Sequence, residues 1–166
     1  MPNRFDSILS KSMGKVKAVK ATLSGLHGVF RTLAEQHGEV KSLLERAKAS
    51  DEKLAELWPT IRRELLSHEK AEMRVIYPQL RNHAETHALA EHHDQEAGEL
   101  EALIERVDAV GRTGDTYDEL VDMVTHHARE EETEIFPKAQ DALGKDQAEA
   151  LEAPFLAAKG QLALVS

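Results

Sequence analysis

His68-Glu-Lys-Ala-Glu72 and His127-Ala-Arg-Glu-Glu131 are two copies of one pattern, in which a glutamate follows a histidine after four residues. An aromatic residue and a proline close each copy, as Tyr77-Pro78 and Phe136-Pro137, ten residues from the histidine to the proline (78 − 68 and 137 − 127). Residues four apart lie on one helical face, so each copy presents an imidazole beside a carboxylate. Two such faces turned toward each other in a helix bundle predict a metal site, and more specifically a two-metal site.

The repeat extends beyond these two segments. Leu33-Ala-Glu-Gln-His37 matches Leu89-Ala-Glu-His-His93 at four of five positions, which aligns His37 with His93. The separations 68 − 37 = 31 and 127 − 93 = 34 residues each fit a helix, a turn and part of the next helix. The sequence therefore predicts two helical hairpins related by a pseudo-two-fold axis, with these candidate metal ligands: His37, His68, Glu72, His93, His127 and Glu131.

Composition narrows the classes of protein that the chain can belong to. Its 166 residues suggest one domain, and 41% apolar content suggests a globular one. A formal net charge of −9 disfavours binding to nucleic acid or to anionic membranes. The absence of cysteine excludes disulfides and thiolate metal sites. We found neither a membrane-spanning stretch nor a signal peptide, so we expect a cytoplasmic location.

The periodicity of apolar residues predicts an all-α protein with an up-down-up-down four-helix bundle. The expected parts are an N-terminal helical extension (1–22), the bundle (23–143) and a short C-terminal helix and tail (144–166). The basic extension is interpreted as a solvated helix, with a membrane-surface helix as the alternative. Ser50-Asp51 is a helix-start signal, but Pro59 is expected to break or restart that helix. The expected helices are about Phe5–Ala49 with a break near Gly25–Gly28, Thr60–Leu80, His87–Val110, Thr116–Ala142 and Asp146–Ala158.

The ligand types indicate which metals fit. Imidazole nitrogen suits borderline metals such as iron, and a carboxylate can bridge two ions. Zinc or manganese is compatible with the same ligands. Glu72 and Glu131 would be costly to bury together without a cation, because two carboxylates would share one apolar space.

At these residues the chain, over about 23–143, resembles the hemerythrin-like HHE cation-binding family. The resemblance implies a non-haem di-iron centre held by the six candidate ligands and bridged by the two glutamates and an oxo, hydroxo or peroxo species. Two departures from the oxygen-carrying hemerythrins are visible. Leu89 stands where those proteins have a histidine four residues before His93, and Glu131 follows His127 by four residues where they have an aspartate after five.

The resemblance and these departures together favour reaction with O2 or H2O2 over oxygen transport. Catalase-like peroxide disproportionation ranks first, and non-enzymatic sensing or binding of oxygen, iron or nitric oxide is the alternative. No nucleic acid or membrane partner is expected.

Several neighbours compete with the candidate ligands. A step of one residue turns a side chain by about 100° on a helix, so only one member of His92–His93 and of His126–His127 should face the core. We expect His83 and His87 at the surface and His27 in the core or in a position that supports the site. Tyr77 is expected to donate a hydrogen bond at the site, and Phe136 to pack where its helix ends. The acids expected in solvent are Glu69, Glu130, Glu132 and Glu134, of which Glu69 could reach the edge of the site.

Overall fold

The computed structural model describes residues 25–111 and 114–166. Every regular element within these two stretches is helical, which confirms the all-α prediction. None of these helices is both long enough and apolar enough to cross a bilayer. The predicted N-terminal extension, 1–22, lies outside the described residues. The elements are α2 Gly28–Ala47, α3 Asp51–Val75, α4 Tyr77–Arg81, α5 Ala84–Val110, α6 Thr116–Glu130, the π-helical turn η1 Glu131–Ile135, α7 Phe136–Leu143, α8 Lys145–Ala150 and α9 Glu152–Ala163.

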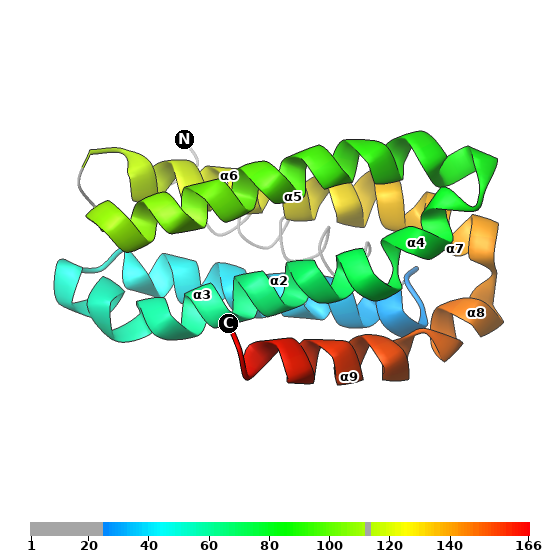
Figure 1. Cartoon of the computed structure of the whole chain (residues 1–166), viewed down its shortest axis with the longest axis horizontal. Helices are drawn as coiled ribbons and strands as arrows, with labels where there is room; N and C mark the ends of the chain where they lie inside the picture. Colours follow the sequence, from blue (N-terminus) through cyan, green and yellow to red (C-terminus); the bar gives the residue numbers. More distant parts are fainter. Residues whose placement is uncertain (1–24, 112–113) are drawn as a thin grey trace, which may run out of the picture.

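Four long helices, α2, α3, α5 and α6, run side by side with alternating direction, so the up-down-up-down bundle is confirmed (Figure 1). The short helices α4, α7 and α8 gather at one end of the bundle (Figure 1). The C-terminal helix α9 packs along α3 as a fifth long element (Figure 1). The single short helix expected over Asp146–Ala158 is in fact two helices, α8 and α9.

The expectation that Pro59 breaks a helix is wrong. Helix α3 begins at Asp51, where the Ser50 side chain accepts a hydrogen bond from the Lys53 backbone N–H, and it continues through Pro59. Pro59 is exposed, so the backbone carbonyl that loses its partner faces water. Leu57 and Ile61 on either side are buried, and their packing holds the helix together across the proline.

The helix is instead interrupted at Ile76, immediately before the first aromatic–proline pair. Pro78 then occupies the first turn of α4, where its missing N–H costs nothing. The turn expected over 81–86 is shorter than predicted, because α5 begins at Ala84 and not at His87.

The second aromatic–proline pair produces a different irregularity. The chain from Glu131 to Ile135 forms a π-helical turn, and the Phe136 N–H donates to the Glu131 carbonyl, five residues back. Proline cannot continue an α-helical ladder, and its ring clashes with the carbonyl four residues before it. A widened turn directly before Pro137 accommodates the ring, and such turns are frequent at functional sites. Its first residue is the candidate ligand Glu131.

The core consists of two apolar clusters with a polar layer between them. On α2, Leu33 belongs to one cluster and Val40 to the other, with His37 between them. Leu65 on α3 and Ile76, which directly follows α3, belong to opposite clusters and enclose Glu72. The buried histidines and glutamates are therefore sealed from both ends of the bundle by packed side chains.

Gly28→Ala is expected to destabilise the metal-loaded protein by about 2–4 kcal/mol, from overpacking and left-handed backbone strain. Gly28 has φ +52°, and a Cβ there would lie 2.3 Å from the carbonyl oxygen of Ala148, where α8 packs on α2. Gly38→Ala is the control, because nothing lies within 4 Å of its added Cβ and alanine favours a helix interior. Urea denaturation should separate the two; equal stabilities would contradict the close approach of α8.

Candidate metal centre

The structure brings all six predicted residues together in the polar layer. Each helix of the bundle contributes, and Glu131 comes from the first residue of the π turn. The positions are His37 on α2, His68 and Glu72 on α3, His93 on α5, His127 on α6 and Glu131 on η1.

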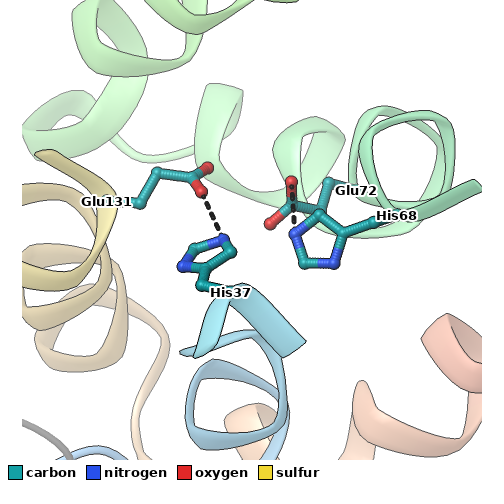
Figure 2. A group of neighbouring side chains, drawn as sticks. All are labelled: His37, His68, Glu72 and Glu131. Carbon is teal, nitrogen blue, oxygen red and sulfur yellow. Dashed lines mark ion pairs between the residues drawn. The ribbon is translucent and has the colours of Figure 1, made fainter. Parts of the chain in front are cut away.

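The first half of the site contains His37, His68, Glu72 and Glu131, whose ligand atoms all lie within 4.8 Å of one another. His37 Nε2 is 3.1 Å from Glu131 Oε2, and His68 Nε2 is 3.4 Å from Glu72 Oε2 (Figure 2). The two histidines and two carboxylates point toward a common centre (Figure 2). This is a mixed nitrogen and oxygen site of the kind that suits iron, zinc or manganese.

The second half contains Glu69, Glu72, His93 and His127, again with ligand atoms within 4.8 Å. His93 Nε2 lies 3.1 Å from Glu69 Oε1 and 3.2 Å from Glu131 Oε1. His127 Nε2 lies 3.4 Å from Glu69 Oε2 and 3.6 Å from Glu131 Oε2. Glu72 thus belongs to both halves, and Glu131 contacts histidines of both, so these two carboxylates lie between the two halves of the site.

Glu69 is a seventh member of the cluster. The expectation that it is solvated is wrong, whereas the alternative that it reaches the site agrees with the structure. It is buried and lies between His93 and His127. The signal was present in the sequence, because Glu69 and Glu72 are three residues apart and so share a helical face. His68-Glu69-Lys-Ala-Glu72 has an additional acid that the second copy lacks at the matching position, Ala128.

Nine buried side-chain atoms in the described residues have no hydrogen-bond partner, and all of them belong to this cluster: His37 Nε2, His68 Nε2, Glu69 Oε1, Glu72 Oε1 and Oε2, His93 Nδ1 and Nε2, His127 Nε2 and Glu131 Oε2. Unsatisfied buried polar atoms are rare and costly in proteins. Metal–ligand bonds of about 2.1 Å place neighbouring donors roughly 3.0 Å apart in an octahedron and 3.4 Å in a tetrahedron. The separations here, 3.1 to 3.6 Å, fit metal ions.

In three histidines, the ring nitrogen that points away from the centre, Nδ1, forms a hydrogen bond with a side-chain oxygen, which fixes the orientation of the ring. His37 Nδ1 is 2.9 Å from Glu132, His68 Nδ1 is 2.9 Å from Gln36, and His127 Nδ1 is 3.0 Å from Glu96. A partner on Nδ1 directs the Nε2 lone pair to the centre and strengthens the ligand. Glu132 was expected to be solvated. It is instead half-buried, and its side chain pairs with His37.

The two aromatic residues of the repeat support the histidines of the opposite hairpins. The ring of Tyr77 stacks on His93 with centroids 3.5 Å apart, and the ring of Phe136 stacks on His37 at 5.8 Å. Tyr77 also donates its hydroxyl hydrogen to Glu131 Oε1 at 2.5 Å, which Phe136 cannot do. Each aromatic residue of the repeat therefore stacks on a histidine of the site, and Tyr77 in addition supplies a hydrogen-bond donor.

The charges in the cluster are unevenly distributed. Burial, reinforced by the negative charges of Glu131 and Glu69, raises the pKa of Glu72 well above its ordinary value. Burial would also raise the pKa of Glu131, but His127, His37 and His93 outweigh it and lower that pKa. Without metal, Glu72 therefore holds a proton more readily than Glu131 does, and a cation would take the place of that proton.

The histidines differ in the same way. Burial and the neighbouring His37 lower the pKa of His68 to about 3. Burial opposes protonation of His127 as well, but Glu131 and Glu69 raise its pKa to about 12. His68 is thus a neutral ligand ready for metal, whereas His127 must release a proton when metal binds, so binding should weaken in acid.

A cavity of about 260 Å³ lies against the cluster and is lined by His37, His68, Glu69 and His127 together with apolar side chains such as Leu65 and Val124. Lys159 from α9 also lines it, and its ammonium group pairs with Glu64 at 2.8 Å. The cavity gives a small molecule access to the centre.

The adjacent histidines point away from the centre, as the helical geometry predicted. His92 and His126 have side chains 52% and 74% exposed, whereas His93 and His127 are buried. His87 is exposed and His83 half-buried near the turn, and His27 is exposed and takes no part in the cluster.

Residues 28–139 match the hemerythrin HHE cation binding domain. The match covers more than half of the chain, which therefore belongs to the hemerythrin HHE cation-binding family, as the sequence resemblance suggested. The chain is also similar to a protein named DNA nickase from Nostoc sp. (strain PCC 7120 / SAG 25.82 / UTEX 2576), with 28% identity over 132 residues. That similarity covers 76% of this chain but only 37% of the nickase. No solved structure gave a significant match.

Proposed function

We propose that this chain binds two iron ions and reacts with O2 or H2O2, with peroxide disproportionation (2 H2O2 → 2 H2O + O2) as its activity. The observation that carries the proposal is the pair of ligand clusters joined by Glu72 and Glu131 beside a small cavity. Bound iron would supply a Lewis acid that can also exchange electrons with an oxygen ligand. His37 and His68 would hold one ion, and Glu69, His93 and His127 the other, with the two shared glutamates between them.

Residues of the chain would position the ligands and provide space for the substrate. The cavity of about 260 Å³ beside the ligands has room for a molecule of the size of peroxide. The Nδ1 hydrogen bonds of His37, His68 and His127 hold the imidazoles in place. The Tyr77 hydroxyl fixes the orientation of Glu131 through Oε1 and keeps a proton next to that carboxylate.

Iron-loaded protein should evolve oxygen from peroxide, and His68→Ala should lower the rate by about 100-fold, because it removes a neutral ligand at the cavity wall. His87→Ala is the matched control, since that exposed histidine lies outside the cluster. An oxygen electrode gives the rates. Equal rates for wild type and His68→Ala would refute the activity; reversible oxygen binding without turnover would favour the sensing alternative.

The similarity to the nickase raises metal-dependent DNA cleavage as a second candidate. Two-metal centres do hydrolyse phosphodiesters. Here, however, six of the seven cluster residues are buried and the side chain of His68 is only 13% exposed, so a nucleic acid backbone cannot reach the ligands in this structure. The net charge of −9 also repels DNA. We therefore propose that nucleic acid is not a substrate of this chain, and supercoiled plasmid added to the same iron-loaded sample should stay unnicked.

A further inference from the structure

The two histidine pairs of the chain, His92–His93 and His126–His127, lie on facing positions of α5 and α6. The inner member of each pair belongs to the buried centre. The outer members, His92 and His126, reach the surface on a neighbouring face of the same two helices. Because α5 and α6 pack together, the outer imidazoles are brought to one place, where Glu96 and Glu130 also lie.

The donor atoms of this outer group converge. His92 Nε2 is 3.4 Å from Glu96 Oε1 and 3.7 Å from Glu130 Oε1. One ligand atom from each of the three residues lies within 4.8 Å of the other two. His126 Nε2 lies 3.8 Å from the second oxygen of Glu130, just outside this group of three converging residues.

These separations are those of donors around a metal ion. Donors of a tetrahedral site with bonds of about 2.1 Å lie roughly 3.4 Å apart. Both carboxylates are largely shielded, at 17% and 20% exposed, which strengthens their attraction for a cation. Within the described parts of the chain, neither Glu96 nor Glu130 forms an ion pair with a lysine or arginine.

We propose that His92, Glu96 and Glu130 form a second and separate site for a borderline divalent cation such as Zn²⁺ on the surface of α5 and α6, and that His126 turns toward the bound ion as a fourth donor. Two imidazoles and two carboxylates are a ligand set that such ions favour. None of these four residues is a ligand of the buried centre, so the outer site adds to the two-metal site and does not compete for its side chains.

The outer site is connected to the buried centre through one carboxylate. Glu96 Oε1 faces His92, while its Oε2 lies 3.0 Å from His127 Nδ1. A cation on Oε1 would draw charge from the carboxylate and weaken its hydrogen bond to His127. Partners at this position set the strength of the histidine as a ligand. Occupancy of the outer site should therefore change the properties of the buried centre.

Another pair on α5 provides a matched comparison. His87 and Glu91 have the same spacing of four residues, His87 has the same 52% side-chain exposure as His92, and the distance of 3.3 Å between them is similar. This pair has no partner from α6 and does not form a three-residue group within the described residues. It should bind a cation far more weakly than the outer site.

The test is equilibrium dialysis of the iron-loaded full chain against Zn²⁺, followed by analysis of zinc and iron in the same sample. Wild type should take up one more zinc ion per chain than His92→Ala or Glu130→Gln, whose affinity should fall at least about tenfold. His87→Ala should match wild type. The readout is this difference of one ion, so it does not depend on which metal fills the buried centre or on peroxide activity.

A second readout tests the connection. Saturating zinc should shift the optical spectrum of the iron centre in wild type but not in His92→Ala. Zinc uptake that is the same in wild type, His92→Ala and Glu130→Gln would overturn the site, as would zinc uptake matched by an equal loss of iron. His92 and His87 are exposed and Glu130 is partly exposed, and retained iron in the same sample shows that the variants are folded.

Discussion

Removal of metal with a chelator is expected to lower the Tm of this protein by roughly 15–30 °C. An ion present at a thousand times its Kd stabilises the folded state by about 4 kcal/mol, so two ions contribute about 8 kcal/mol. For a domain of this length, 1 kcal/mol corresponds to about 2–4 °C. The physical source is the set of nine buried atoms without hydrogen-bond partners, which only a cation can satisfy together.

Calorimetry before and after chelation, and again after iron is restored, measures this shift. His68→Ala should show a smaller shift than wild type, because it loses a ligand of one ion, whereas His87→Ala should show the full shift. A Tm that is unchanged by chelation in wild type would mean that the cluster tolerates its unsatisfied atoms without metal, and the two-metal assignment would fail.

The bundle could be predicted from the sequence because its repeat is local. Each HxxxE segment fixes two side chains on one helical face, and the matching single histidines fix the order of the hairpins. Pro59 shows where local rules fail. Its effect depends on whether the freed carbonyl faces water or the core, and that depends on how α3 packs. The π turn at Glu131–Ile135 likewise follows from a compromise between Pro137 and the packing on either side.

Candidate ligands that follow a spacing pattern along one helix could be predicted from the sequence. The residues that support them from a neighbouring helix could not. Gln36, Glu96 and Glu132 hold histidines that belong to other helices, so their partners depend on the rotation of each helix about its axis. Glu69 was predicted only at the edge of the site. Its place inside the cluster depends on His93 of α5 and His127 of α6, which meet it across the bundle.

Glu72→Gln and Glu131→Gln should both abolish tight metal binding but change the metal-free protein in opposite directions. The folded-state pKa of Glu72 is raised above its ordinary value of 4.5 by burial and by Glu131. Between these two pKa values, the folded protein keeps Glu72 protonated whereas the unfolded chain has released that proton. Glu72 therefore lowers the free energy of unfolding by up to about 1.4 kcal/mol per pH unit as pH rises from 4.5 toward the raised pKa. Glutamine carries no proton to lose, so Glu72→Gln should be more stable than wild type without metal, by an amount that grows with pH.

Glu131 has the opposite sign. Its pKa is lowered by His127, His37 and His93 despite its burial, so its contribution to stability is fully present above 4.5 and is lost only as pH falls through the lowered value. Glu131→Gln removes one of the two buried counter-charges of His127 and His93, and leaves only Glu69. It should cost up to about 3–5 kcal/mol, and this cost should shrink as pH rises through the His93 pKa of about 9. Urea denaturation of metal-free wild type and both variants across neutral and alkaline pH gives the two curves. Parallel curves for the two variants would show that the glutamates carry the same charge, and the assignment of the buried proton to Glu72 would be wrong.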